Sequence, residues 1–348
     1  MNNTFMNNCK TIFNSLMDQE SKFIFEERLL FSCTCDNKHI KNVINSLEEG
    51  KKIIDLINSN YDLYIFGAGI WGKELIKVWP NRFKAFIDNN ANKWGKKIGD
   101  ISIISPKKIL DNNFSGKVLI STRLYYNEIY KQLLSIGIKA KDIINIGEIQ
   151  DKLAKKQYFD LPQLNLNEEI FADVGSLDGM TALELIREKD KKFKKVYCFE
   201  PDKQNIPKCQ HNLKLYIAQG KAFVIPKGCW SFDGKLSFLS QGNGGSTFTL
   251  KESIELDKAS VDVTRLDTIF EEERVSFVKM DIEGAEIEAL KGCKGIIKKY
   301  APKLAICVYH KPEDIYELPG LILKYNPKYK LYLRHYSVTA AETVLYAI

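Results

Sequence analysis

Hydrophobic and polar positions follow two different rhythms along the chain. Residues 1–60 place apolar side chains at helical spacing, as in TIFNSLMDQESKFIFEERLLF, which predicts a segment of helices. From residue 61, short apolar runs rich in β-branched and aromatic residues alternate with amphipathic stretches. This alternation, which ends near residue 150, predicts βαβ units with a parallel sheet.

A second alternating series follows residues 151–168, whose periodicity is weak and which we interpret as a linker. Its apolar runs are IFADVG, KVYCFEP, AFVIPKG, SFVKMD, LAICVYH and YKLYLRHY. We therefore expect an α/β fold with two tandem Rossmann-like doubly wound domains, residues 61–150 and 169–348. The N-terminal helical segment would precede them.

The first domain carries a glycine motif between a predicted strand and a predicted helix. Gly67, Gly69 and Gly72 fit the pattern G-x-G-x-x-G, and Asp88 ends the next strand, 21 residues after Gly67. Such glycines permit close approach of a pyrophosphate, and the acid can accept hydrogen bonds from ribose. A tight turn without a ligand explains the pattern equally well. The stretch FIDNN…KWGKKIGDISIISPKKIL resembles the small nucleotide-binding domain of some bacterial sugar-modifying enzymes, which implies a sugar nucleotide before NAD.

The second domain carries a differently spaced motif. In FADVGSLDGMTALELI, the residues Asp173, Gly175, Ser176 and Gly179 follow a strand, and Glu200 ends the next strand. The spacing suits a loop that wraps an adenosine and an amino-acid tail, while a carboxylate at the second strand end can accept from both ribose hydroxyls. Together these features predict an S-adenosylmethionine site.

The stretch FVKMDIEGAEIEALKG, residues 277–292, concentrates four carboxylates within ten residues. Like charges repel one another, so the cluster needs an explanation. A helix N-terminus is one, because acidic side chains are favoured there, and an active site at the carboxyl end of a strand is the other.

The same stretch resembles the signature K-x-D-x-E-G-x-E of the FkbM family of methyltransferases. The matching residues are Lys279, Asp281, Glu283, Gly284 and Glu286. DVGSLDG stands where the family more often has D-V-G-A-N-x-G, so the departures are at Ser176 and Leu177. The resemblance covers about residues 165–348. It implies an S-adenosylmethionine-dependent enzyme that methylates hydroxyl oxygens, commonly on sugars or secondary metabolites.

Methyl transfer to a hydroxyl requires alignment of the reactants, worth about 7–11 kcal/mol, and removal of a proton, worth about 10²–10⁴-fold in rate. Asp281, His310 and His335 follow predicted strands whose carboxyl ends should line the acceptor pocket, and we take them as candidate catalytic residues. A histidine at a strand end is more often structural. Asp281, Glu283 and His310 could alternatively hold a divalent ion, Mg²⁺ or Mn²⁺.

Composition narrows the classes of partner. The 348 residues are 45% hydrophobic and 27% charged, as in ordinary globular proteins. The apolar runs are too short for a membrane span, and the N-terminus does not resemble a signal peptide. Eight cysteines without disulfide-framework or zinc spacing suggest a reducing cytoplasm. The net charge of +7 is spread along the chain, which disfavours nucleic acid but suits an anionic sugar nucleotide.

The sequence thus predicts an O-methyltransferase that acts on a sugar, with a nucleotide-linked precursor of a surface polysaccharide as the expected substrate. A non-catalytic sugar-nucleotide-binding or scaffold protein is the alternative, and an NAD-dependent oxidoreductase ranks third. The sequence does not identify the sugar, its methylated hydroxyl or the oligomeric state. A homo-oligomer is compatible with it. The glycine-rich residues 242–248 suit either a lid beside the cofactor or a hairpin end.

Overall fold

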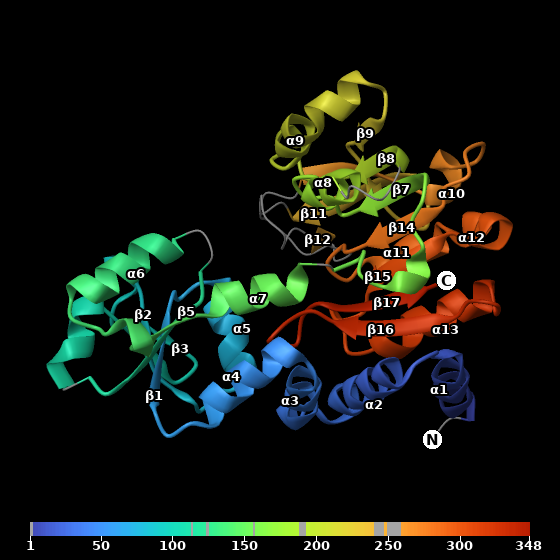
Figure 1. Cartoon of the computed structure of the whole chain (residues 1–348). Coiled ribbons are helices and arrows are strands. Elements are labelled where there is room, and N and C mark those ends of the chain that lie inside the picture. The colour runs from blue at the N-terminus through green and yellow to red at the C-terminus, as the bar shows by residue number, and fades with distance from the viewer. Residues whose placement is uncertain are drawn as a thin grey trace. The chain divides into compact units, whose positions relative to one another are not determined.

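The computed structural model describes residues 3–112, 114–122, 125–155, 157–187, 193–239, 247–248 and 259–348. The fold is mixed α/β with parallel sheets and many helices, which confirms the predicted fold class (Figure 1). Most of the predicted glycine-rich loop, residues 242–246, lies outside the described residues. Among the described helices, none combines the length and apolar character needed to cross a membrane.

The chain divides into two compact units, and each is discontinuous in sequence. Unit 1 comprises residues 1–25, 158–334 and 343–348, and unit 2 comprises residues 26–157 and 335–342. Helix α2 (Gln19–Thr34) has residues in both. Sequence periodicity does not show which distant segments pack together, so it cannot predict that a unit is discontinuous. The contiguous domain ranges expected from the sequence stay a prediction.

Unit 2 contains a six-stranded sheet in the order β3-β4-β2-β1-β5-β6, parallel except for the antiparallel β3–β4 pair. Its strands are β1 (Asp62–Phe66), β2 (Phe83–Ile87), β3 (Lys97–Ile98), β4 (Ile101–Ile104), β5 (Gly116–Ile120) and β6 (Ile143–Asn145). Its helices are α3 (Asn37–Ser46), α4 (Glu48–Asn58), α5 (Ile70–Val78), α6 (Tyr126–Ser135) and α7 (Ile146–Ala154), with 3₁₀ turns η1 (Ala91–Lys93), η2 (Pro106–Asn112) and η3 (Ala140–Asp142).

Both faces of this sheet are buried. Leu63 and Ile65 of β1 pack with apolar residues of α3, α4, α5 and α7, whereas Phe66 packs on the other side with residues of α6. Alternate side chains of a strand point to opposite faces, so a strand covered on both sides needs a continuous apolar run. This requirement explains why YIF in β1 lacks a charged position.

Residues 335–342 complete unit 2 although they lie near the C-terminus. Gln150 Nε2 donates to the Tyr336 carbonyl at 2.8 Å, and Arg28 Nη1 donates to the Ala340 carbonyl at 2.6 Å. Val338 is buried in the apolar cluster of the unit. These contacts make the connection between the last two strands of the chain an integral part of unit 2.

Unit 1 contains a seven-stranded sheet in the order β16-β17-β15-β14-β7-β8-β9 and a four-stranded sheet in the order β10-β13-β11-β12. The large sheet has strands β7 (Glu169–Val174), β8 (Phe193–Phe199), β9 (Ala222–Ile225), β14 (Phe277–Met280), β15 (Lys303–Cys307), β16 (Leu331–His335) and β17 (Thr343–Ala347). The small sheet has strands β10 (Gly228–Cys229), β11 (Gly234–Leu239), β12 (Thr247–Phe248) and β13 (Ala259–Thr264). The helices are α1 (Asn3–Ser15), α8 (Met180–Arg187), α9 (Ile206–Ala218), α10 (Leu266–Ile269), α11 (Glu286–Lys291), α12 (Lys294–Tyr300) and α13 (Asp314–Tyr325), with the 3₁₀ turn η4 (Pro162–Leu164).

The order of strands reverses beside β7. The chain passes from β7 to β8 and β9 in one direction, then returns so that β14 pairs parallel with β7 on its other side. In unit 2 the same reversal occurs at β1, between β2 and β5. In open α/β sheets, ligands bind outside the carboxyl ends of the strands at such a switch point. The topology therefore marks one candidate site in each unit.

Part of the stretch interpreted as a linker packs against the sheet of unit 1. The ring centroid of Phe159 lies 6.0 Å from that of Phe171 in β7 and 6.1 Å from that of Phe277 in β14. Leu161 and Leu164 are also buried. The segment that carries them is neither an α-helix nor a strand, so its apolar residues recur at neither helical nor strand spacing. The sequence pattern therefore does not predict this packing.

Candidate functional site

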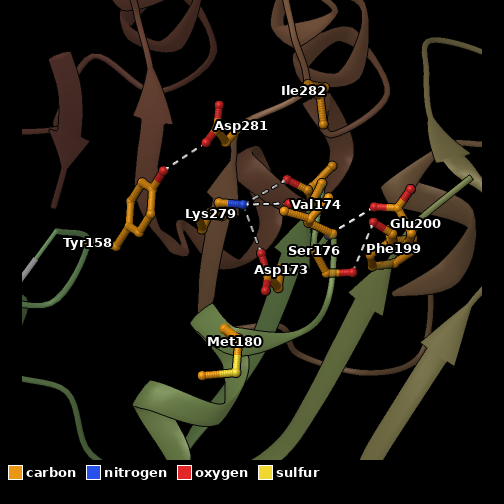
Figure 2. Close-up of polar contacts among 12 residues, drawn as sticks. Tyr158, Asp173, Val174, Ser176, Met180, Phe199, Glu200, Lys279, Asp281 and Ile282 are labelled. Carbon is orange, nitrogen blue, oxygen red and sulfur yellow. Dashed lines mark hydrogen bonds and ion pairs between the residues drawn. The ribbon is translucent and has the colours of Figure 1, made fainter. Parts of the chain in front are cut away.

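The carboxyl ends of β7 and β14 bring the predicted cofactor motif and the acidic cluster together. In the parallel pairing Lys279 lies opposite Asp173 and Met280 lies opposite Val174. The Asp281 amide then donates to the Val174 carbonyl at 3.1 Å. Asp281 therefore lies directly beside the start of the glycine loop, as Figure 2 shows.

Lys279 is a buried cation at the centre of this junction. Its Nζ lies 3.0 Å from Asp173 Oδ1 and donates to the Gly175 carbonyl at 2.8 Å. Burial alone would lower the pKa of Lys279, but the negative charges of Asp173 and Asp281 outweigh it and raise that pKa. The ammonium therefore stays charged and fixes the start of the glycine loop to β14.

The glycine loop needs its glycines for conformation and for space. Gly175 and Gly179 have φ of +80° and +78°, where side chains are disfavoured. A Cβ on Gly175 would lie 2.0 Å from the Asp281 carbonyl oxygen. Ser176 Oγ donates to the Phe199 carbonyl at 3.3 Å, so the loop is also joined to β8.

Glu200 follows β8 and holds the other side of the loop. One carboxylate oxygen accepts from the Leu177 amide at 2.8 Å, and the other accepts from the Asp202 amide at 2.8 Å. Burial raises the pKa of Glu200 to about 7. Each carboxylate oxygen has a second lone pair, so Glu200 can still accept from ribose hydroxyls. Asp173 differs: it is fully buried with Lys279, which suits a role in shaping the loop from below.

Asp281 sits among hydrogen-bond donors but keeps 26% of its side chain exposed. Tyr158 donates its hydroxyl to Oδ2 at 3.0 Å, and Tyr309 donates to Oδ1 at 3.4 Å. His310 Nε2 also lies 3.4 Å from Oδ1. Burial would raise the pKa of Asp281, but the nearby His310 and the Lys279 charge outweigh it and hold that pKa below its usual range.

His310 lies between carboxylates on both ring nitrogens. Its Nδ1 is 3.1 Å from Glu286 Oε1, and its Nε2 is 3.8 Å from Glu283 Oε2 besides its contact with Asp281. Burial would lower the pKa of His310, but its close contacts with the Asp281 and Glu286 carboxylates raise it to about 11. The ring is therefore an imidazolium at neutral pH. Glu286 also accepts from the Ile282 amide at 2.8 Å, so it stabilises the turn before α11. This contact agrees with the alternative that the acidic cluster marks a helix N-terminus.

The acidic cluster offers ligand atoms that a metal ion could use. Among the described residues, ligand atoms of Asp281, Glu286 and His310 come within 4.8 Å of one another, while the predicted set with Glu283 stays a prediction. A metal-bound imidazole must be unprotonated, whereas both nitrogens of His310 face carboxylates that hold its proton. The metal set therefore stays a prediction, and we assign no step to a metal.

Comparison with known families agrees with this geometry. Residues 173–330 match the model of the methyltransferase FkbM domain. We call these residues the FkbM-like domain; the match supports an S-adenosylmethionine-dependent methyltransferase activity. Residues 59–144 match a second model, described as C2185-like, N-terminal. Curated proteins gave no match.

Several solved structures resemble the chain. An FkbM methyltransferase from Methylobacillus flagellatus is 20% identical, with 87% of this chain and 94% of that chain covered and a TM-score of 0.48. Fibrillarin from Aeropyrum pernix, with natively bound S-adenosylmethionine, is 11% identical, with 56% and 72% covered and a TM-score of 0.35. TrmK from M. capricolum, in complex with S-adenosylhomocysteine, is 15% identical, with 55% and 67% covered and a TM-score of 0.31.

His335, the third candidate catalytic residue, ends β16 at the first position of the segment that belongs to unit 2. Burial and the nearby Arg28 charge lower its pKa to about 3, although hydrogen bonds with the backbone of Thr339 and Ser337 oppose the shift. His335 is thus a neutral, buried ring among polar groups of unit 2. Its catalytic role stays a prediction.

The glycine motif of unit 2 lies at the switch point beside β1. Gly67 has φ of +111°, and a Cβ on Gly72 would lie 2.4 Å from the Gly67 carbonyl oxygen, so both positions require glycine. Asp88 Oδ2 accepts from the Ala68 amide at 3.0 Å and from Lys93 Nζ at 2.9 Å. Burial would raise the pKa of Asp88, but Lys93 and the backbone donors lower it. The carboxylate therefore closes the turn.

A cavity of about 480 Å³ opens over this turn. Its lining residues are Phe66, Gly67, Gly69, Asp88, Asn89, Lys93, Thr122, Tyr125, Glu128 and Ile129. A cavity of this size can accommodate a small organic ligand. Of the four predicted nucleotide-binding residues, Gly67, Gly69 and Asp88 line it, while Gly72 packs beneath the turn.

Three residues near the two sites are not predicted by the sequence patterns. Tyr158 lies in the predicted linker, Tyr309 directly precedes a candidate histidine, and Lys93 follows the acid of the first motif. The place of Tyr309 at a predicted strand end is a signal that could have identified it. The position of Tyr158 carries no such signal.

Proposed function

We propose that the chain is an S-adenosylmethionine-dependent O-methyltransferase whose acceptor is a hydroxyl of a sugar, carried on a nucleotide. The partly exposed Asp281 carboxylate, held among donors beside the glycine loop, is the observation that carries the proposal. The match of residues 173–330 to the FkbM domain supports the cofactor. The acceptor class rests on the family resemblance and on the cavity in unit 2.

The residues around the glycine loop fit the cofactor. Glu200 provides acceptors for ribose hydroxyls, and the loop from Gly175 to Gly179 gives the backbone room for the adenosine and amino-acid portions. Bound S-adenosylmethionine would supply a methyl group that its sulfonium already activates. The protein must therefore align the acceptor and take up its proton.

Asp281 is the group we assign to the proton. An attacking hydroxyl becomes strongly acidic as its oxygen is methylated, so even a carboxylate of lowered pKa can accept the proton late in the step. His310 is protonated at neutral pH and cannot do so. We therefore infer that His310 balances the charge of Asp281 and Glu286, while Asp281 contacts the acceptor.

The cavity of unit 2 suits the nucleotide of a nucleotide sugar. Lys93 offers a cation for phosphate, α5 begins directly after Gly69 so that its N-terminal end favours an anion, and the 62% exposed Tyr125 offers an aromatic face. A non-catalytic sugar-nucleotide-binding protein would use the same cavity. The two functions differ in whether a methyl group is transferred.

Methyl transfer can be measured directly. The full chain would be incubated with radiolabelled S-adenosylmethionine and a panel of nucleoside diphosphate sugars, and label would be followed into the sugar. Isothermal titration with S-adenosylhomocysteine and with NADH would run in parallel. Binding of S-adenosylhomocysteine with turnover supports the proposal; nucleotide-sugar binding without any cofactor binding supports the scaffold alternative; NADH binding alone supports the oxidoreductase.

A further inference from the structure

Tyr158 occupies a fixed and costly conformation at the edge of the acidic site. Its φ is +74°, a region that side chains disfavour, and it is only 7% exposed. Its amide donates to the Tyr346 hydroxyl at 3.0 Å. A residue stays in such a conformation only when its surroundings hold it there, and such residues concentrate at functional sites.

The ring and the hydroxyl of Tyr158 contact different partners. The ring centroid lies 5.5 Å from Lys279 Nζ, within the range of a cation–π contact. The hydroxyl oxygen lies 3.0 Å from Asp281 Oδ2 and 3.5 Å from Cys307 Sγ (Figure 2 shows the first contact). A phenol has one proton, so when it donates to Asp281 the thiol can donate to it. This arrangement directs the hydroxyl proton of Tyr158 to the Asp281 carboxylate.

Tyr158 approaches the Asp281 carboxylate more closely than Tyr309 and His310 do. Those two residues both lie 3.4 Å from Oδ1, whereas Tyr158 alone among the three approaches Oδ2. A hydrogen bond to each oxygen fixes the rotation of a carboxylate about its Cβ–Cγ bond. Removing the Tyr158 hydroxyl would therefore weaken the hold on the Oδ2 side.

We propose that Tyr158 is a positioning residue for methyl transfer, which orients Asp281 toward the acceptor hydroxyl. The inference rests on the proposed function, because Asp281 must meet an acceptor for its orientation to matter. Misplacement of a reacting group by about 1 Å can cost about 100-fold in rate. We expect Tyr158→Phe, which keeps the ring and its contact with Lys279, to lower kcat about 10- to 100-fold. The Kd of S-adenosylhomocysteine should stay within about twofold of wild type, since the hydroxyl faces Asp281.

Tyr329→Phe provides the matched control. Its side chain is similarly buried in unit 1 and its hydroxyl donates to the Pro302 carbonyl at 2.6 Å, so this variant loses one internal hydrogen bond that does not involve Asp281. Both variants would be measured for Tm, kcat and KM with the acceptor found in the methyl-transfer screen. A purely structural role predicts that both lose Tm alike and that neither changes kcat.

A double-mutant cycle tests whether Tyr158 acts through Asp281. Tyr158→Phe should lower kcat in the wild-type background but change it less than about twofold in Asp281→Asn, since residues acting as one unit are not additive. An undiminished effect in Asp281→Asn, or a wild-type kcat in Tyr158→Phe, would overturn the proposal. If the wild-type chain transfers no methyl group to any acceptor, the proposed function itself fails, and that outcome is separate from these.

Discussion

Lys279 Nζ lies 3.0 Å from Asp173 Oδ1, across the two strands whose carboxyl ends form the candidate site of unit 1. Both side chains are almost fully buried, with exposures of 3% and 0%. A buried charge is tolerated only when it is paired, so each residue depends on the other. The pair explains why a lysine occupies the middle of an otherwise apolar strand.

The first prediction concerns this pair. Lys279→Met fills a similar volume but leaves Asp173 buried without its partner, which should cost about 3–5 kcal/mol in the free energy of unfolding. Chemical denaturation of the full chain would measure it. Lys291→Met is the control: its pair with Glu288 at 2.6 Å is partly exposed, and its loss should cost at most about 1 kcal/mol. Equal losses in the two variants would show that the buried pair contributes nothing special.

How far the sequence predicts this site depends on the residue. Asp281, Gly175 and Glu200 are predictable because each follows a β-rich apolar run, and parallel strands end at one edge of a sheet. In the structure the strands that precede them meet at the switch point. The buried Lys279 is part of the family motif, but its partner can be identified only from the strand register, which no local pattern contains.

The remainder cannot be predicted from the sequence, for a physical reason. Tyr158 belongs to an irregular segment that is held by its packing partners, and those lie more than a hundred residues away in the sequence. Residues 335–342 likewise enter unit 2 through long-range contacts with Arg28 and Gln150. Such contacts are fixed by the tertiary fold and have no local signal.

The second prediction uses the pKa of Glu200. Burial raises that pKa to about 7, and ribose hydroxyls that donate to the carboxylate favour its ionised form. Affinity for S-adenosylhomocysteine should therefore rise with pH, by about tenfold between pH 6 and pH 8, as the ionised fraction grows. Isothermal titration at both values would measure it. Glu200→Gln has no such titration, so its affinity should be weaker but nearly constant; a wild-type Kd that does not change with pH would contradict the assignment.

The same shift has a consequence for stability. The unfolded carboxyl titrates near 4.5 and the folded one near 7, so the folded state binds more protons in between. Its contribution is fully present below pH 4.5 and is lost as pH rises through 7. Without ligand, the free energy of unfolding of wild type relative to Glu200→Gln should accordingly fall between pH 4.5 and pH 7. The affinity for S-adenosylhomocysteine should rise with pH instead.

The third prediction separates proton transfer from metal chemistry at Asp281. Asp281→Asn should lower kcat about 100-fold or more, the scale of losing a general base, while S-adenosylhomocysteine still binds. Tm should fall as well, because the lowered pKa of Asp281 means that its ionised carboxylate stabilises the folded state. Treatment with EDTA should leave wild-type activity unchanged, because the proposed proton transfer to Asp281 needs no metal ion. Activity that EDTA abolishes and Mg²⁺ or Mn²⁺ restores would instead establish a metal. Near-wild-type kcat in Asp281→Asn would leave the acidic cluster as a helix terminus.

The fourth prediction addresses the cavity of unit 2 and needs the full chain. A truncated chain that begins after residue 160 would lose Tyr158 and would separate residues 335–342 from the rest of their unit. Lys93→Ala is a gentler change, because Lys93 lines the cavity and its side chain is 37% exposed. Loss of a hydrogen bond to a charged phosphate costs about 1.5–3 kcal/mol, so a nucleoside diphosphate sugar should bind about 10- to 150-fold more weakly.

Two further variants make that test specific. Gly69→Val should also weaken nucleotide-sugar binding without loss of stability, since a Cβ at Gly69 meets nothing within 4 Å and its φ is −104°. Lys84→Ala removes an exposed lysine that pairs with Asp62 at 3.5 Å in the same unit, and it should bind like wild type. Binding of S-adenosylhomocysteine, which we assign to unit 1, should be the same in all three. If Lys93→Ala and Gly69→Val bind every nucleotide sugar as wild type does, the glycine motif of unit 2 only shapes a turn, and the acceptor must be recognised without it.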